Sequence, residues 1–357
     1  MRNEWFVLFL VSCVLASGCM QSNVETEGDD AAVNAGGLDK LRIGWQTTWA
    51  TQGQLSQILQ KTDILESEGI EGEFVGFAYG GPLNTGALAG SVDVVFTADQ
   101  PALTLLSKTD DFEIIGRLMY NSGALMVHPE SGYEDIGDLE GQKVAVPFVA
   151  AVHRVLIGLE KDAGLVPDQD ITNVNLGINE IISTAESGKD SGWGDIGAMM
   201  VWDPTPFILE EKGLSKTIAR GDIVAVVLMS KEKTKDPEVP RRFMRAFKKA
   251  YYYYAVNSDQ ANTWFADSAM IEYDPSILDK ASAFEPNVGV EVFDDVRVQL
   301  NEGDLDTLKT VSAFMVSQEL IEEDIDIDSV VNQEYVVKAD EELKSEGFDV
   351  SSVKVIA

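Results

Sequence analysis

Residues 142–156 read Gln-Lys-Val-Ala-Val-Pro-Phe-Val-Ala-Ala-Val-His-Arg-Val-Leu and carry the strongest fold signal in the chain. Lys143–Pro147 has the apolar, β-branched character of a short buried strand. The residues after it repeat apolar side chains at helical spacing, at Val152, Val155, Leu156, Leu159 and Ala163. This spacing predicts a helix packed on a sheet, with Lys161 and Gly164 as its end. The stretch therefore predicts a strand that leads directly into a helix.

The start of this predicted helix lacks an ordinary cap. Backbone N–H groups in a first helical turn have no partner within the helix, and Ser, Thr, Asp or Asn usually satisfies them. Residues 148–152 are Phe-Val-Ala-Ala-Val, which offer no side-chain acceptor. Either a bound anion, favoured by the helix dipole, or water must then satisfy these donors. The sequence leaves both alternatives open.

Composition limits the partners of the chain. Its 357 residues are 45% hydrophobic, which is enough for two domains with cores. The formal net charge of -33 makes nucleic acid and anionic membrane surfaces poor partners, and it suits life in high salt. It does not exclude an anionic ligand, because a local group of N–H donors can outweigh distant charges that are screened over about 8 Å.

Cysteine and histidine are too scarce for most metal or redox chemistry. The two cysteines, Cys13 and Cys19, lie at the N-terminus, so a disulfide framework or thiolate site is not expected in the folded domain. The two histidines, His128 and His153, do not suffice for a histidine metal centre. The acidic run 322–328 has three carboxylates at calcium-loop spacing but lacks the glycine and the final glutamate. A metal site made of carboxylates alone stays open as an alternative, and we expect no metal and no cofactor.

The N-terminus has the pattern of an export signal. An apolar run at 5–16 is too short to span a bilayer comfortably, and Leu15-Ala16-Ser17-Gly18-Cys19 resembles a prokaryotic lipobox. This pattern predicts a signal peptide at 1–18, lipidation of Cys19, and a disordered polar tether over 19–37. Plain secretory cleavage, with Cys19 incidental, is the alternative.

Strands and helices alternate through most of the remaining chain. Strands are predicted at 41–45, 73–77, 92–97, 113–120, 124–127, 143–147, 171–176, 196–202 and 223–229, and helices become dominant after Pro237. Such alternation predicts an α/β fold with parallel strands. The break between 113–120 and 124–127 is interpreted as the first crossing into a second lobe.

Three tryptophans lie where open α/β sheets bind ligands. Trp45, Trp49 and Trp202 each follow or end a predicted strand. An aromatic ring there can cover the apolar body of a small ligand. Packing beneath the connection between lobes is the alternative for Trp202, and helix capping is the alternative for Asp99, which precedes Gln100 and Pro101.

Several motifs together resemble one known family. They are Ala145-Val146-Pro147-Phe148 with His153, Val201-Trp202-Asp203-Pro204, Gly86-Ala87-Leu88-Ala89-Gly90-Ser91-Val92-Asp93 with Asp99-Gln100-Pro101-Ala102, and Asp138-Leu139-Glu140-Gly141-Gln142-Lys143-Val144-Ala145-Val146. In this order they resemble the solute-binding proteins of ABC importers for taurine, alkanesulfonates and nitrate, and the chain is also similar to the NMT1/THI5-like group. The resemblance covers Leu38 to about Tyr335.

The resemblance implies a two-lobed, type II periplasmic-binding fold, in which each lobe is a mixed, mostly parallel sheet flanked by helices. Lobe I would comprise 38–122 and 229–357, and lobe II would comprise 123–228. Ligand would lie in the cleft, and the lobes would close over it. Together with the tryptophan positions, the resemblance gives these candidate ligand-binding residues: Trp45, Gln46, Trp49, Asp99, Gln100, Phe148, Val149, Ala150, Trp202 and Asp203.

One departure from the family concerns the ligand. Taurine and sulfonate binders usually place Ser or Thr after the Pro-Phe pair, whereas this chain has Val149-Ala150-Ala151. Backbone donors remain, but the hydroxyl groups are missing. A flatter or less charged solute, such as a pyrimidine vitamin precursor, is therefore an alternative to a sulfonate.

We accordingly expect a monomeric lipoprotein, anchored through Cys19 to the outer face of the cell membrane, that captures a solute of the sulfonate, taurine or nitrate class. It would deliver this solute to an ABC permease driven by a cytoplasmic ATPase, with no catalysis. An enzyme of the pyrimidine-synthase type with the same fold is the alternative from another functional class. A ligand-sensing module is a third class, and it would need a signalling domain.

Overall fold

The structure, a computed structural model, describes residues 37–269, 274 and 276–356. Its strands are β1 Asp39–Gln46, β2 Ile70–Phe77, β3 Val94–Ala98, β4 Phe112–Val127, β5 Lys143–Val146, β6 Thr172–Asn175, β7 Ile196–Trp202 and β8 Lys216–Ser230. Its α-helices are α1 Gln52–Lys61, α2 Ile64–Ser67, α3 Gly80–Leu88, α4 Asp99–Leu106, α5 Ala151–Asp162, α6 Ile178–Ser187, α7 Thr205–Glu211, α8 Lys231–Thr234, α9 Glu238–Val256, α10 Ser258–Ala269, α11 Ile277–Ser282, α12 Glu302–Ser317, α13 Ile327–Val330 and α14 Glu334–Glu346. Short 3-10 helices are η1 Ile136–Leu139, η2 Pro286–Gly289, η3 Phe293–Asp295 and η4 Val350–Ser352. The predicted signal peptide, Cys19 and nearly all of the predicted tether lie outside the described residues.

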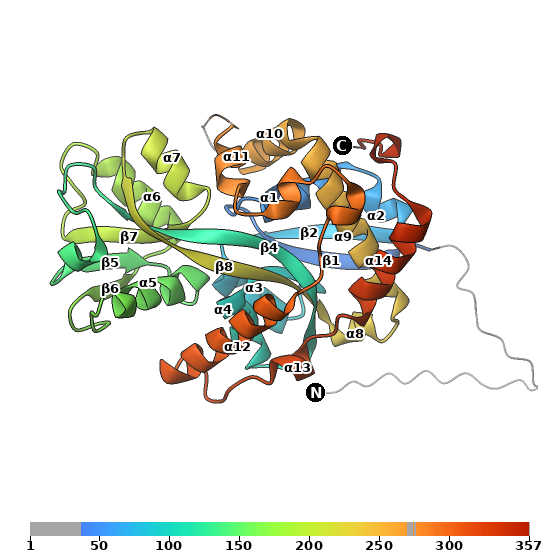
Figure 1. Cartoon of the computed structure of the whole chain (residues 1–357), viewed down its shortest axis with the longest axis horizontal. Helices are drawn as coiled ribbons and strands as arrows, with labels where there is room; N and C mark the ends of the chain where they lie inside the picture. The colour runs from blue at the N-terminus through green and yellow to red at the C-terminus, as the bar shows by residue number, and fades with distance from the viewer. Residues whose placement is uncertain (1–36, 270–273, 275, 357) are drawn as a thin grey trace, which may run out of the picture. The chain divides into compact units, whose positions relative to one another are not determined.

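One mixed sheet contains all eight strands, in the order β2-β1-β3-β8-β4-β7-β5-β6. At one end β1 pairs in parallel with β2 and β3, and at the other β5 pairs in parallel with β6 and β7. The central strands β8 and β4 run antiparallel to their neighbours. The α/β class with mostly parallel strands at each end is thus confirmed, but the two ends belong to one continuous sheet (Figure 1).

The prediction of two strands at 113–120 and 124–127 is wrong, because β4 continues through the break. Asn121 pairs with Ile223, Ser122 with Asp222, and Gly123 with Gly221. Residues 121–123 are polar or glycine, a composition that is typical of turns. In the structure they stay extended and pair with β8, which provides hydrogen-bond partners for their backbone. The predicted lobe boundary at 122/123 lies inside this strand. The lobe boundaries at 122/123 and 228/229 stay predictions.

Helices enclose the two ends of the sheet separately. In Figure 1, α5, α6 and α7 surround the β7-β5-β6 end, whereas α1, α9 and α14 lie around the β2-β1-β3 end. The aromatic residues that recur along α9, namely Phe243, Phe247, Tyr251 and Tyr254, are fully buried. The aromatic residues of α9 therefore belong to the core, where large rings supply much of the buried apolar area.

Two glycines let α5 approach the centre of the sheet closely. A Cβ at Gly123 would lie 2.8 Å from Cγ1 of Val152, and one at Gly221 would lie 2.4 Å from Cγ1 of Val155. Because Gly123 and Gly221 are paired across β4 and β8, they form one patch of the sheet without side chains, against which the helix packs. This packing places the first turn of α5 beside β4 and β8, the strands that join the two ends of the sheet.

The acidic run 322–328 connects α12 and α13. Asp324 accepts a hydrogen bond from Ser312, and Asp328 pairs with Lys309 at 3.1 Å. Ile327 is buried, and Ile325 packs against the same core. The run therefore connects two helices, and its isoleucines pack inward.

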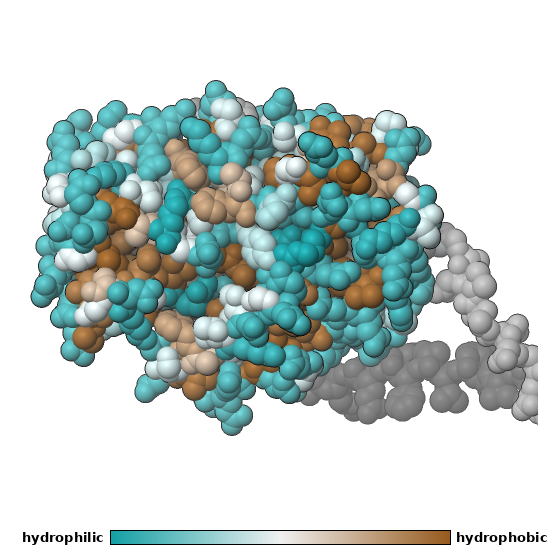
Figure 2. All heavy atoms as spheres, viewed as in Figure 1, coloured by the Kyte–Doolittle hydropathy of each residue, from teal (hydrophilic) through white to brown (hydrophobic). Residues whose placement is uncertain are grey.

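Hydrophilic residues dominate the face shown in Figure 2, as the high charge leads one to expect. Apolar residues form scattered patches on the face shown. Among the described residues, no helix is long and apolar enough to cross a membrane.

Candidate ligand-binding cleft

A small cavity lies between the two ends of the sheet, at the carboxyl ends of parallel strands. It is lined by Gln46, Trp49, Gly80, Ala98, Pro101, Ala150, Ala151, Val152, Trp202 and Ile223. Gln46, Ala98 and Trp202 end β1, β3 and β7, and residues 150–152 follow β5. Open α/β sheets bind ligands at this edge, because the connecting loops separate there. The cavity is therefore the candidate ligand-binding cleft.

Four predicted site residues line this cavity: Gln46, Trp49, Ala150 and Trp202. Trp45 does not, because alternate residues of a strand point to opposite faces, and its indole lies near Gly76 instead. The lining residues that sequence reasoning missed are Gly80, Ala98, Pro101, Ala151, Val152 and Ile223. Most of them are small or apolar and carry no chemical signal. Only their places beside strand ends could have indicated them.

The first turn of α5, which lines the cavity, has no side-chain cap in the part of the chain that the structure describes. Ala150 is the N-cap residue, and no side chain of the described residues caps the helix. The amide of His153 donates to the carbonyl of Ala150 at 3.0 Å, which leaves the amides of Ala151 and Val152 as the first-turn donors. Both residues line the cavity. The predicted uncapped start is confirmed, and its dipole favours an anionic group here.

Two tryptophans add polar and aromatic character. Trp49 donates from Nε1 to Oδ1 of Asn121 at 2.9 Å. The Nε1 of Trp202 is buried and has no hydrogen-bond partner within the described part of the chain. The ring of Trp202 lies 6.5 Å from that of Tyr79, which precedes α3 on the opposite side. An unpaired buried donor costs free energy, so a ligand that accepts from Trp202 would gain affinity.

Asp99 is not free to contact a ligand in this structure. Its Oδ1 accepts from the amide of Gln100 at 2.6 Å, but the N-cap residue of α4 is Ala98, so the capping alternative for Asp99 is wrong. Its Oδ2 accepts from Arg154 at 2.8 Å and from the amide of Val224 at 3.3 Å. The carboxylate is fully buried. Gln100 is also buried and, like Asp99, does not line the cavity.

Asp203 is likewise held by protein groups. Arg220 pairs with its Oδ1 at 3.0 Å, and the Ser122 hydroxyl donates to its Oδ2 at 2.9 Å. Its carbonyl accepts from the amide of Ala50 at 3.3 Å, which ties the loop after β7 to the loop after β1. Burial raises the pKa of Asp203 to about 6, although Arg220 opposes this shift. The residue supports the wall behind Trp202.

Phe148 and Val149 lie just outside the cavity. Phe148 stacks on His153 with ring centroids 4.4 Å apart, and its amide donates to Oδ1 of Asn175 at 2.9 Å. Val149 has φ +66°, which is strained for a β-branched residue, and its side chain is exposed. Burial lowers the pKa of His153, so its ring is neutral near pH 7 and adds no positive charge.

The cavity is too small for an organic solute as it stands. Its volume of about 20 Å³ accommodates roughly one water molecule. Small-molecule sites usually measure about 300–1,000 Å³. An organic solute would fit here only if the β2-β1-β3 end and the β7-β5-β6 end separated, with β4 and β8 as the connection.

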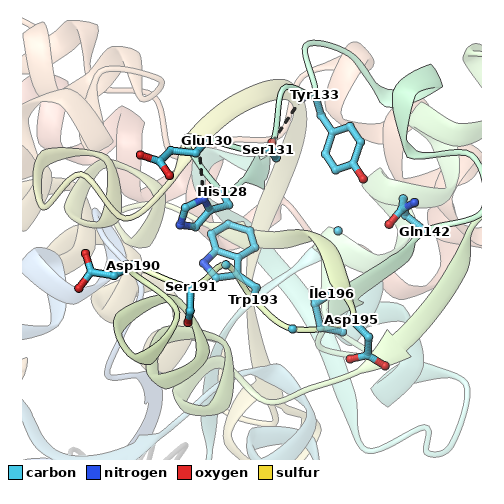
Figure 3. Close-up of a pocket in the computed structure, with 13 residues that line it drawn as sticks. His128, Glu130, Ser131, Tyr133, Gln142, Asp190, Ser191, Trp193, Asp195 and Ile196 are labelled. Carbon is cyan, nitrogen blue, oxygen red and sulfur yellow. Dashed lines mark hydrogen bonds between the residues drawn. The ribbon is translucent and has the colours of Figure 1, made fainter.

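A larger pocket lies at the opposite edge of the β7-β5-β6 end (Figure 3). It measures about 420 Å³, and its wall carries the carboxylates of Glu130, Asp190 and Asp195. Both ring nitrogens of His128 are engaged, with the carbonyl of Lys189 at 3.1 Å and the amide of Glu130 at 3.3 Å. Exposed carboxylates repel anions, so this pocket does not suit an anionic solute.

A buried carboxyl group on α5 makes stability depend on pH. Burial raises the pKa of Glu160 to about 7 from an ordinary value of 4.5. The folded protein thus holds this proton more tightly than the unfolded chain, and stability is lost as pH rises through 7. We expect Glu160→Gln to raise the free energy of unfolding at pH 8 by about 1–3 kcal/mol and to have little effect below pH 4.5. Urea unfolding of both proteins across this range measures the difference, and an equal gain at all pH values would contradict the assignment.

The fold and the cleft together define a class: a two-sided α/β protein with a candidate ligand-binding cleft between the ends of its sheet. Its family is also established, because residues 65–261 match the family model described as NMT1/THI5 like. The chain belongs to this family.

Individual relatives have low sequence identity to this chain, but they match it over most of its length. A Bacillus subtilis (strain 168) protein named for binding aliphatic sulfonates is 24% identical over 319 residues, covering 87% of this chain and 91% of that protein. The alkanesulfonate-binding protein SsuA from Xanthomonas axonopodis pv. citri, solved with MOPS, has TM-score 0.67 and 19% identity, covering 84% of this chain and all of that one. The desulfurization enzyme DszB has TM-score 0.65 and 14% identity, covering 85% and 99%. The two structures confirm the fold and also show that it occurs in an enzyme.

Proposed function

We propose that this protein is the extracytoplasmic solute-binding component of an ABC importer and that its solute is an organic anion of the sulfonate class. The observation that carries the proposal is that one cavity is lined both by the uncapped start of α5 and by Trp202, whose Nε1 is buried without a partner among the described residues. Sulfonate oxygens accept several hydrogen bonds at once, and here all the donors come from backbone and indole N–H groups. The Bacillus relative, named for binding aliphatic sulfonates, and the Xanthomonas protein, solved with the sulfonate MOPS, support the same ligand class.

Binding would proceed by closure of the cleft, and delivery by docking on a permease with a cytoplasmic ATPase. The protein would act as a monomer and perform no bond chemistry. Among the described residues, the cavity wall offers no nucleophile with an adjacent base, since its polar side chains belong to Gln46, Trp49 and Trp202. Turnover of a bound sulfonate by the purified protein would favour the enzyme alternative, for which DszB provides a structural precedent.

A titration panel tests the ligand class. Calorimetry would compare MOPS, hexanesulfonate, taurine and nitrate with a neutral aminopyrimidine. We expect the organic sulfonates to bind at least tenfold more tightly than the pyrimidine, because only the anions complement the helix dipole. The aromatic lining formed by Trp49 and Trp202 favours the pyrimidine as the second candidate. Tighter binding of the neutral compound would establish that alternative.

A matched variant tests whether the ligand accepts a hydrogen bond from Trp202. Trp202→Phe keeps the aromatic cover and removes only the N–H donor. For a sulfonate that accepts from Nε1, affinity should fall by about 1–2 kcal/mol, the scale of one hydrogen bond. For a ligand that only stacks, affinity should hardly change. The same calorimetric titration with MOPS distinguishes the two results.

We further propose that Cys19 carries a lipid that anchors the protein to the outer face of the cell membrane. Cys19→Ala should then release the protein from the membrane fraction without lowering its melting temperature. Fractionation with immunodetection measures this. Retention of the variant in the membrane pellet would show that Cys19 is not the anchor.

A further inference from the structure

Arg154 and Asp99 connect the two ends of the sheet across the cleft. Asp99 follows β3 directly, whereas Arg154 lies in the first turn of α5 after β5. In the sheet order, three strands separate β3 from β5. The guanidinium of Arg154 donates to Oδ2 of Asp99 at 2.8 Å and to the carbonyl of Asp222 on β8 at 3.2 Å. One side chain thus reaches both the far end of the sheet and the connecting strand.

The pair is formed under conditions that make it strong. The Asp99 side chain is fully buried and that of Arg154 is 17% exposed, so water screens the charges little. A buried carboxylate without a counter-ion is unfavourable. If the two ends separate, α5 withdraws Arg154, and Asp99 must find water instead. The ion pair is therefore available only when the cleft is closed.

We propose that Arg154 and Asp99 are positioning residues that hold the cleft closed around the solute without touching it. This inference rests on the proposed function insofar as it assumes opening and closing of the cleft. Arg154 lies three residues after Ala151. The pair therefore also fixes the first turn of α5, whose residues Ala151 and Val152 line the cavity. Because each charge neutralises the other, recognition of an anion remains with the N–H donors.

Hydrogen exchange of the full chain, with no solute added, tests the closing role. The variant Asp99→Asn keeps the size of the side chain and an acceptor for the Gln100 amide, but it removes the charge. We expect amide exchange to become at least fivefold faster in peptides that cover the starts of α4 and α5, and to stay unchanged in β1 and β2. The control is Arg42→Gln, which breaks a 2.7 Å ion pair with Asp93 at one end of the sheet only.

Calorimetry with MOPS tests the effect on binding. Asp99→Asn and Arg154→Gln should each weaken affinity at least tenfold, and the double variant should be no more than threefold weaker than the singles, since they remove one shared interaction. Arg42→Gln should leave affinity within twofold. Stronger binding by Asp99→Asn, with weaker binding by Arg154→Gln, would show that Arg154 contacts the solute directly and would overturn the inference.

The two failures can be told apart. If wild type binds none of the sulfonates, the proposed ligand class is wrong, and the exchange measurement still decides the closing role. If exchange at the starts of α4 and α5 is equal in wild type and Asp99→Asn, the positioning role is wrong, whatever the solute is. Melting temperatures of all variants identify any that loosen the whole fold, because these would exchange faster in β1 and β2 as well.

Discussion

Replacing Ala150 with aspartate should weaken sulfonate binding by about 2 kcal/mol or more, roughly 30-fold, the scale of a lost charged hydrogen bond. Ala150 is the N-cap residue of α5, has extended backbone angles suited to a capping side chain, and lines the cavity. An aspartate there would accept from the amides of the first turn and place a negative charge where the solute needs donors. It would thus both compete with an anion and repel it.

Ala150→Asn is the matched control for this prediction. Asparagine has the same size and also caps helices, but it carries no charge. Titration of both variants with MOPS separates repulsion from simple filling of the cavity. We expect the aspartate variant to bind at least fivefold more weakly than the asparagine variant. Equal affinities would show that the charge of this position is irrelevant and would remove the start of α5 from the anion site.

Of the substitutions discussed here, replacement of Arg117 should cause the largest loss of stability. Its side chain is 1% exposed, and it forms two hydrogen bonds to the buried carboxylate of Glu285, at 2.5 and 2.9 Å. Glu285 also accepts from the amides of Tyr120 and Asn287, so it joins β4 to η2. Arg117→Met would leave the carboxylate buried without a counter-ion. We expect the free energy of unfolding to fall by about 3–5 kcal/mol in urea denaturation.

The surface pair Lys40–Glu71 provides the comparison. Its side chains are 78% and 54% exposed at a distance of 3.2 Å, so Lys40→Met should change stability by less than about 1 kcal/mol. The double variant Arg117→Met/Glu285→Gln should recover part of the loss, because no unpaired charge remains. A loss by Arg117→Met as small as that of Lys40→Met would contradict the importance of the buried pair.

The repeating patterns of the chain predicted its elements well. The strand at 196–202 coincides with β7, and the apolar stripe after Pro147 corresponds to α5. These predictions succeed because hydrophobic periodicity is local and follows from burial on one face. The break placed at 121–123 fails for the opposite reason. Asn121, Ser122 and Gly123 look like a turn, and only the partner strand β8 shows that they remain extended.

For the cleft, the sequence by itself determined the strand-end residues and the uncapped start of α5. Trp49 and Trp202 follow from their places after strands, because parallel strands end at one edge of a sheet, whereas Gln46 and Ala150 came from the family resemblance. Local pattern also determined the missing cap, since residues 148–152 contain no polar side chain short enough to provide one.

Only the tertiary structure decided which side chains are free to meet a solute. Asp99 and Asp203 have the chemistry of ligand contacts, yet Arg154 and Arg220 occupy them. Arg154 lies 55 residues after Asp99, and Arg220 lies on β8 whereas Asp203 follows β7. No local sequence pattern predicts such pairs. Burial makes them necessary, because a carboxylate removed from water must find a cation or several donors. The sequence placed the charges near the cleft, and the packing of distant strands neutralised them.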